Sequence, residues 1–224
     1  MDYTFLADTI LFRGIAPKEI ESMLHCLQAT VKTYPRGANI YNAGDTATFM
    51  GLVLSGGVSI ESDDIWGNRS ILDHVAPGQM FAENYACVPG EPLMVNVVAI
   101  EQTEILAMHA EKLFTVCSNV CGSHSKLIRN LLSISAQKGL NLSRRIMHTS
   151  SKTIRGRLLS YLSFQARKNG SREFDIPFNR QQLANYLSVD RSAMSAELSR
   201  MQRDGLLQVR RSHFVLCSSG SDPE

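Results

Sequence analysis

Apolar residues change their spacing along the chain, and each spacing predicts a different kind of structure. Between residues 4 and 30 the spacing is helical, and Pro17 suits the first turn of a helix. From 31 to about 108 the pattern becomes short alternating or apolar runs separated by glycine, with DIWGN (64–68) at the expected tip of one hairpin. Such runs predict the strands of a small antiparallel sandwich or barrel.

A helical spacing returns after residue 109 and narrows to a stripe. No proline interrupts residues 123–148, and a helix of that length, at about 1.5 Å per residue, is a rod of roughly 40 Å. Because a small barrel cannot cover so long a rod, a dimerising coiled coil is favoured, and a helix packed only on its own barrel is the alternative. The expected seam contains Leu127, Leu131, Ile134 and Leu142.

The C-terminal third predicts a compact mixture of helices and strands. A helix is expected over 150–168, ended by Asn169-Gly170. A short strand pair in EFDIPFN, two helices and a terminal hairpin (LLQVRRSHFVLCS) follow, and the tail 218–224 is expected to be disordered.

Composition places the chain among ordinary globular proteins, with 44% hydrophobic and 20% charged residues. No apolar run approaches the roughly 18 residues that a membrane span needs, and the acidic N-terminus is unlike a signal peptide. Five irregularly spaced cysteines favour reduced thiols over a disulfide framework. We therefore expect a cytoplasmic protein without a membrane partner.

The net charge of +2 conceals an asymmetry. Residues 1–149 contain 11 Lys and Arg against 14 Asp and Glu, whereas residues 150–224 contain 12 against 7. A basic C-terminal third favours a polyanion partner, and a solvated basic face is the alternative.

The strongest functional signal lies in residues 179–207, which predict two short helices joined by a tight turn. Asn179 can cap the first helix with Gln182 as its capping-box partner, Asp190 can cap the second, and Gly205 can end it. Inside a basic region this geometry lays the second helix in the major groove of DNA, and an ordinary helical hairpin with a polar face is the alternative.

The polar positions of this segment divide into two groups of candidate DNA contacts. Base edges are expected to meet the first turns of the second helix, at Arg191, Ser192, Ser195 and Ala196. Donors at the start of the first helix, together with other arginines, can hold phosphates, the last two from a wing-like hairpin. These are Asn179, Arg180, Gln181, Arg200, Arg203, Arg210 and Arg211.

Four motifs in this order resemble the family of the cyclic-AMP receptor and the fumarate–nitrate regulator (Crp–Fnr), over residues 5–217. They are PRGANIYNAGD (35–45), LVLSGGVSI (52–60), HVAPGQMFAE (74–83) and RQQLANYLSVDRSAMSAELSRMQRDGLL (180–207). The resemblance implies a homodimeric bacterial transcription regulator that binds a pseudo-palindromic operator in double-stranded DNA. RNA polymerase is the further partner it implies, and no enzymatic activity is expected.

The implied fold is α+β, in three parts and a tail. Residues 1–108 would form an effector-sensing β-roll, an antiparallel double-stranded barrel like a cyclic-nucleotide-binding domain, with N-terminal helices. Residues 109–148 would form a long dimerisation helix and hinge, and 149–217 a winged helix-turn-helix, followed by the tail 218–224.

The recognition helix departs from the family pattern at two positions. Ser192 replaces a frequent Glu, and Ala196 replaces a frequent Arg. A bidentate Arg–guanine contact is worth ~1–3 kcal/mol of discrimination. Because Ala196 cannot make it, the operator should differ from the family's best-known palindromes at that base pair.

The segment FAENYACVPGEPLMVNVVA (81–99) keeps the frame of the family's cyclic-nucleotide cassette without its phosphate partners. Glu83 matches the family's ribose-binding Glu, but Leu93 and Met94 stand where an Arg-Ser pair would grip the cyclic phosphate. No Arg or Lys lies between residues 70 and 111. A buried phosphate without a cationic or hydroxyl partner is strongly unfavourable, so cyclic AMP is not expected.

Two interpretations of the pocket remain open. An apolar effector can lodge between the long helix and Leu93, Met94 and Val95, or the protein has no effector. Glu83 can contact the ligand, or its carboxylate can accept hydrogen bonds from backbone N–H groups at the turn.

Redox or metal sensing by thiols is a further alternative. An iron–sulfur cluster would need about four cysteines in an N-terminal group, where only Cys26 lies. Cys117 and Cys121, with His124 nearby, could bind a metal or form a thiol switch, or could pack as small apolar residues.

Isolated histidines argue against haem and against an enzyme. Haem needs a placed axial ligand, whereas His25, His74 and His109 stand alone. A cupin-like metal enzyme, the remote alternative, needs a His-x-His group with a following Glu, which is absent from the sequence. We expect neither a cofactor nor a metal.

Overall fold

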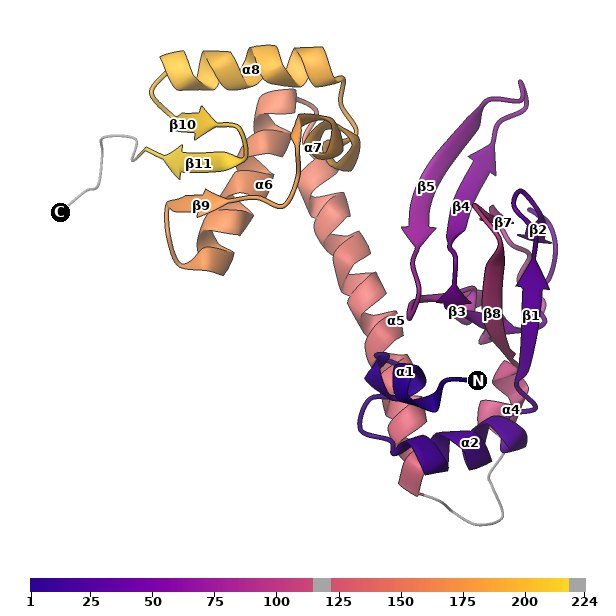
Figure 1. The fold of residues 1–224 in the computed structure, drawn as a ribbon. Helices are drawn as coiled ribbons and strands as arrows, with labels where there is room; N and C mark the ends of the chain where they lie inside the picture. The colour runs from indigo at the N-terminus through magenta and orange to yellow at the C-terminus, as the bar shows by residue number, and fades with distance from the viewer. Residues whose placement is uncertain (115–121, 218–224) are drawn as a thin grey trace. The chain divides into compact units, whose positions relative to one another are not determined.

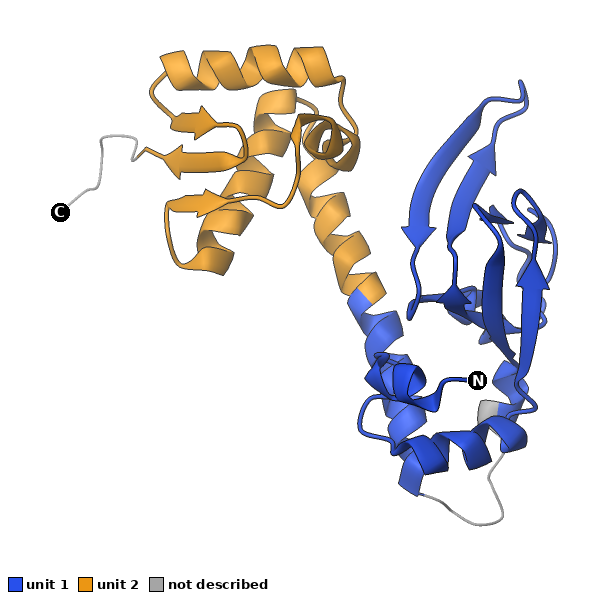
Figure 2. Ribbon diagram, in the orientation of Figure 1, with its two compact units in different colours: residues 1–137 blue, residues 138–224 orange. Residues whose placement is uncertain are grey.

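The computed structural model of the chain describes residues 1–114 and 122–217. It divides into two compact units, residues 1–137 and 138–224 (Figure 2). Each unit buries apolar residues of its own.

The first unit begins with two short helices, as the spacing predicts. Asp2 caps α1 (Tyr3–Asp8) by accepting hydrogen bonds from two backbone N–H groups of the first turn, at 2.9 and 3.0 Å. Pro17 occupies the first position of α2 (Pro17–Cys26), and the Glu19 carboxylate accepts a hydrogen bond from the N–H that precedes the helix, at 3.0 Å.

Eight strands form the predicted antiparallel double-layered roll (Figure 1). One sheet has the order β1-β8-β3-β6 and the other the order β2-β7-β4-β5. Val53 and Ile105 from the first sheet pack with Val58 and Val97 from the second in one core. The bounds are β1 (Thr30–Tyr34), β2 (Asn39–Tyr41), β3 (Met50–Ser55), β4 (Val58–Asp63), β5 (Arg69–Val75), β6 (Met80–Phe81), β7 (Asn96–Ala99) and β8 (Thr103–Met108).

The hairpin between β4 and β5 turns at residues 64–68, as predicted. Asp64 Oδ1 accepts the backbone N–H groups of Trp66 and Asn68, both at 2.9 Å, and Gly67 has a positive φ of 83°. The local chemistry of Asp, Gly and Asn therefore fixes this turn, and it leaves Trp66 80% exposed.

The opposite face of the first sheet packs against helices. Leu52 and Leu106 lie in a core with α1, α2 and the start of α5 (Gly122–Thr149), which α4 (Ala110–Phe114) precedes in the chain. The loop between α1 and α2 fixes α5 at this place, because Asn130 Nδ2 donates to the carbonyls of Leu11 and Arg13 at 2.8 and 2.9 Å.

This attachment corrects the predicted dimer seam. Leu127 and Leu131 are buried in the chain's own core and offer no surface to a partner, and Ile134 packs partly buried against the same core. Leu142 is 61% exposed. The predicted seam is therefore divided, with Leu127 and Leu131 in the chain's own core and Leu142 exposed.

The second unit surrounds a three-stranded sheet with helices. Its strand order is β10-β11-β9, all antiparallel. EFDIPFN forms one strand, β9, which pairs with β11, instead of the expected strand pair, and Pro177 follows it without a ladder donor. The bounds are α6 (Ile154–Asn169), β9 (Glu173–Asp175), α7 (Arg180–Leu187), α8 (Arg191–Arg203), β10 (Leu207–Arg210) and β11 (His213–Leu216).

The division between the units falls inside α5, after Gln137, whereas the sequence suggested a boundary at 148/149. The last turns of α5 pack with the second unit: the ring of His148 is 1% exposed and its Nδ1 lies 2.9 Å from the hydroxyl of Tyr186 on α7. No local sequence signal marks this contact.

Candidate nucleic-acid interface

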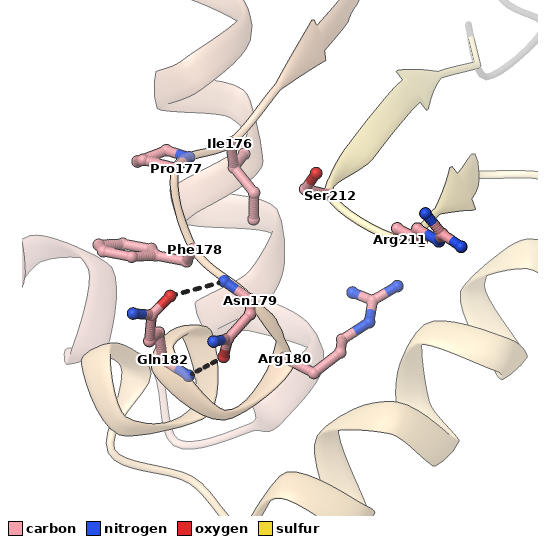
Figure 3. Close-up of a pocket in the computed structure, with 8 residues that line it drawn as sticks. All are labelled: Ile176, Pro177, Phe178, Asn179, Arg180, Gln182, Arg211 and Ser212. Carbon is pink, nitrogen blue, oxygen red and sulfur yellow. Dashed lines mark hydrogen bonds between the residues drawn. The ribbon is translucent and has the colours of Figure 1, made fainter.

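A reciprocal capping box starts α7. Asn179 Oδ1 accepts the backbone N–H of Gln182, and Gln182 Oε1 accepts the backbone N–H of Asn179, both at 2.9 Å (Figure 3). Leu183, Ala184 and Leu187 are fully buried, as the sequence predicts. The opposite side of the first turn therefore carries its polar groups outward.

The turn between α7 and α8 is held by an arginine that sequence reasoning counted only as positive charge. Arg157 Nη1 donates to the carbonyls of Leu187 and Ser188 at 3.0 and 2.9 Å, and its Nε donates to the carbonyl of Ser151 at 2.9 Å. Ser188 is left-handed, with φ 54°. Arg157 thus satisfies carbonyls that the end of α7 leaves without helical partners.

α8 presents one buried and one exposed face. Asp190 Oδ1 accepts the backbone N–H of Ala193 at 2.8 Å, and the hydroxyl of Ser192 also donates to this carboxylate. These hydrogen bonds, that of Ser192 first, lower the pKa of Asp190. The buried face consists of Met194, Leu198 and Met201.

The predicted base-reading residues lie together on the first turns of α8. Arg191, Ser192 and Ala196 are exposed, and Ser195 is half-buried. The Ser195 hydroxyl donates to the carbonyl of Arg191 at 2.9 Å. This hydrogen bond uses the hydroxyl proton of Ser195, whereas the hydroxyl oxygen can still accept a hydrogen bond.

Two further arginines are engaged with carboxylates of the unit. Arg155 on α6 pairs with Glu197 at 2.6 Å and with Asp204 at 2.7 Å, and so ties α6 to α8. Hydrogen bonding from Arg155 is the main reason that the pKa of Glu197 is lowered. Arg200, a predicted phosphate contact, pairs with the same Glu197 at 3.3 Å and stays exposed, whereas Arg203 is exposed at the end of α8.

Arg180 lies in an unusual position for an arginine. Its side chain extends from the start of α7 toward the β10–β11 turn, with the guanidinium carbon 5.5 Å from the ring centroid of Phe214 (Figure 3). Among the described residues, its buried Nη1 has no hydrogen-bond partner. Burial lowers the pKa of Arg180, so the site holds a poorly solvated cation.

An open pocket of about 440 Å³ surrounds this cation. Its polar lining comes from the α7 cap and from the wing (Figure 3). The lining residues are Ile176, Pro177, Phe178, Asn179, Arg180, Gln182, Arg211 and Ser212. A smaller cleft of about 210 Å³ also contacts Arg180 and is lined by Ser195 and Ser199 of α8.

The wing carries two exposed arginines at its tip. Arg210 ends β10, and Arg211 occupies the turn with a left-handed φ of 57°. Below the tip, His213 lies 3.2 Å from Glu173 and 3.3 Å from Asp175, which joins β11 to β9 by side chains as well as by the ladder.

The residues predicted to line an effector pocket in the roll differ in how deeply they are buried. Glu83 is buried at the start of α3 (Glu83–Ala86), and Leu93, 3% exposed, belongs to the core of the roll. Met94 is 76% exposed, its N–H donates to the Tyr85 hydroxyl at 3.4 Å, and Val95 is half-buried. The effector pocket at these residues stays a prediction.

Cys117 and Cys121 lie outside the described residues. Within residues 1–114 and 122–217, no three His, Cys, Asp or Glu side chains gather into a group that could hold a metal ion. No helix in the described part of the chain is both long and apolar enough to cross a membrane.

Comparison with known proteins extends these observations. The family described as "Cyclic nucleotide-binding domain" matches residues 31–120, and the family described as "Crp-like helix-turn-helix domain" matches residues 156–218. The cyclic AMP receptor protein of Thermus thermophilus is 30% identical over 159 residues, 71% of this chain and 64% of that protein. The match therefore spans a little under two thirds of that relative. The CRP-like protein Clp of Xanthomonas axonopodis pv. citri is 24% identical over 201 residues, 83% of each chain.

Solved structures show the same fold. The catabolite activator protein of Thermus thermophilus superposes with a TM-score of 0.52 at 22% identity, covering 94% of this chain and 95% of that one. CprK complexed with OCPA superposes with a TM-score of 0.60 at 14% identity, covering 88% and 91%. These superpositions support the α+β fold expected from the sequence.

Proposed function

We propose that this chain, which belongs to the Crp–Fnr family of transcription regulators, acts in the cytoplasm. It would bind there, as a homodimer, to a pseudo-palindromic operator in double-stranded DNA. The observation that carries the proposal is the two-faced α8. One face is locked into the core by Met194, Leu198 and Met201, while Arg191 and Ser192 are exposed on the first turns of the other. A helix fixed in this way can enter the major groove without losing its packing.

Base reading is assigned to Arg191, Ser192 and Ser195. Arg191 begins α8, and its guanidinium forms no ion pair with another described residue. A bidentate contact with guanine O6 and N7 suits such a side chain. Ala196 offers only a methyl group, which suits contact with a thymine methyl and no hydrogen bond.

Phosphate binding is assigned first to Arg180. A cation with a buried, unpartnered N–H raises the free energy of the free protein, and an incoming phosphate relieves that cost. Arg211 and the polar cap of α7 line the same pocket, so several donors would meet one anion. Gln181, Arg200, Arg203 and Arg210 supply further contacts along the backbone.

Self-association is assigned to the exposed side of α5. Ile128, Leu132, Leu142 and Ile146 are exposed and apolar. Together with Ser135 and Gly139 they follow alternate steps of four and three residues, the spacing of a two-stranded coiled coil. A two-fold dimer built on this stripe would set half-sites about one helical turn apart.

The roll is proposed to respond to an apolar effector or to none, and not to a cyclic nucleotide. Leu93 fills the core where a phosphate-binding arginine would be needed, and no Arg or Lys lies between residues 70 and 111. We also propose RNA polymerase as a protein partner and no enzymatic activity.

A salt titration with selected DNA tests the proposed function. DNA would be enriched from a random-sequence library with the full-length protein, and its affinity measured by fluorescence anisotropy at several salt concentrations. The expected result is a two-fold symmetric site whose affinity falls steeply with salt, with a slope of about 0.9 per neutralised phosphate. A flat salt response, or no enriched sequence, would contradict the proposal.

A further inference from the structure

His148 occupies a closed aromatic site at the end of α5. Its ring, 1% exposed, lies 5.4 and 5.1 Å from the ring centroids of Tyr161 and Phe164 on α6. It lies 5.8 Å from the ring of Tyr186 on α7. Phe178 stacks on Tyr161 and contacts Tyr186 in a tilted arrangement, with 5.1 Å between the latter ring centroids, and so completes the cluster. The last turn of α5 thereby packs on α6 and α7, with the histidine ring in the aromatic part of the contact.

The hydrogen bonding of this ring suits the neutral imidazole. Nδ1 lies 2.9 Å from the Tyr186 hydroxyl, while the buried Nε2 has no hydrogen-bond partner among the described residues. A neutral ring leaves at most one weak group unsatisfied. A second proton would place a charge and an unpaired N–H among aromatic rings.

The positive charge of Arg144 near the ring opposes that second proton. On α5 itself, Arg144 lies one turn before His148, with its guanidinium 5.8 Å from the ring of Phe164, and Arg145 donates to the carbonyl of Asn185 at 3.4 Å. From α6 and α7 the titratable groups are the hydroxyls of Tyr161 and Tyr186.

Both hydroxyls stay protonated near neutral pH, because burial raises the pKa of Tyr161 to about 12 and also raises the pKa of Tyr186. Burial first, and then the charge of Arg144, lowers the pKa of His148. The aromatic faces attract a cation, but they do not accept its N–H as an oxygen atom would.

We propose that His148 is a proton-sensitive lock, which holds the end of α5 on α7 while the imidazole is neutral and releases it when the imidazole is protonated. α7 carries Arg180 and leads into α8. Docking of His148 therefore determines whether these two helices move together with the end of α5. Its effect on DNA affinity rests on the proposed function, whereas the docking itself does not.

The direction of the pH dependence follows from linkage. The docked state binds the proton more weakly than the released state, in which the ordinary histidine pKa of about 6.5 applies. Docking is therefore at full strength above about pH 6.5. It weakens by about tenfold per pH unit below that value, until the lowered pKa of the docked ring is reached.

Hydrogen exchange of the full-length protein tests the lock without DNA. Exchange of the backbone amides of residues 144–149 would be compared at pH 7.5 and 5.0 after correction for intrinsic rates. We expect more than twofold faster exchange at pH 5.0 in the wild type and less than twofold change in His148→Phe, which keeps an aromatic ring that cannot titrate. His213→Gln is the matched control and should behave as the wild type.

Equal protection of these amides at both pH values in the wild type overturns the lock. If His148→Phe does not fold, Tyr186→Phe replaces it: loss of the hydroxyl should speed exchange of the same amides at pH 7.5, and unchanged protection also overturns the proposal. The ratio of the DNA affinities at the two pH values is then compared between the wild type and His148→Phe. The difference gives the coupling between docking of His148 and DNA binding. Absence of any DNA binding would refute the proposed function and leave the exchange result decisive for the lock.

Discussion

The guanidinium of Arg180 lies over the ring of Phe214, with 5.5 Å between the guanidinium carbon and the ring centroid, and one of its terminal nitrogens is buried without a hydrogen-bond partner among the described residues. An arginine at the first position of a helix would normally extend into solvent. Here it is drawn toward the wing, so the start of α7 and the turn that carries Arg211 surround one cationic pocket. The position favours an anion over water and makes Arg180 a costly residue for the free protein.

Arg180→Met should separate stability from DNA binding. Removing a poorly solvated cation while keeping an apolar stem on Phe214 should leave the free energy of unfolding unchanged or raise it. DNA affinity should fall for all sequences, and the salt slope should decrease by about 0.9 for each half-site. Thermal unfolding and anisotropy titrations measure the two effects. Arg167→Met, at an exposed arginine in the last turn of α6, is the control, and an equal loss of affinity there would contradict the assignment.

Arg191→Ala should weaken specific binding by roughly 1–3 kcal/mol while leaving non-specific binding nearly unchanged. The reason is that an exposed arginine on the first turn of α8 can read a guanine, whereas a phosphate contact would weaken both kinds of binding alike. Competition titrations with the selected operator and a scrambled duplex measure the two affinities. Retention of full operator affinity would remove Arg191 from the base-reading set.

The two apolar stripes of α5 should respond to mutation in opposite ways. Leu132→Glu puts a charge on a side chain that is 67% exposed, so it should disrupt the dimer and leave the fold of each chain intact. Leu127→Ala opens a cavity in the chain's own core and should cost about 2–5 kcal/mol of unfolding free energy. Sedimentation and chemical denaturation distinguish these outcomes. A dimeric Leu132→Glu would place the interface elsewhere.

These two stripes also mark how far the sequence could predict the structure. The capping box of Asn179 and Gln182 and the turn at Asp64 depend on neighbouring residues, so their patterns predicted them correctly. Leu127 and Leu132 both fit an apolar helical spacing, but only Leu127 packs with distant residues of α1 and α2, a packing that the hydrogen bond from Asn130 to the carbonyl of Leu11 accompanies. Local periodicity contains no information about such a contact.

The basic C-terminal third illustrates a second limit. The count of arginines favoured a polyanion partner, but the count cannot say which of them face DNA. Arg155 pairs with Glu197 and Asp204, and Arg157 holds backbone carbonyls, so both serve the fold of the unit. The positive charge and the helix-turn-helix were evident in the sequence. Only the structure distinguishes the arginines that stabilise the fold from those that are exposed.

Cyclic AMP should not stabilise the protein. A ligand that binds the folded state raises the unfolding temperature in proportion to RT ln(1 + [L]/Kd), so even weak binding is visible at about 1 mM nucleotide. Because Leu93 is buried where a cationic partner would be needed, we expect the same midpoint with and without the nucleotide, measured by differential scanning fluorimetry. An upward shift that disappears in Glu83→Gln would restore a nucleotide site in the roll.

Arg157→Lys should destabilise the second unit although it keeps the charge. The guanidinium donates to three carbonyls at once, those of Ser151, Leu187 and Ser188, and a lysine ammonium on a longer flexible stem cannot reproduce this fork. Each buried carbonyl that loses its donor costs about 1–3 kcal/mol, reduced where water can replace the arginine, and Ser188 is exposed. We therefore expect a loss of about 1–3 kcal/mol in the unfolding free energy of the unit.

Because these carbonyls belong to the turn between α7 and α8, the same variant should also let the recognition helix move. DNA affinity should fall with little change in the salt slope, since no phosphate contact is removed. Denaturation and anisotropy titrations of Arg157→Lys, beside Lys168→Arg at an exposed site of α6, measure both effects. A lowered salt slope with unchanged stability would instead make Arg157 a direct contact to DNA.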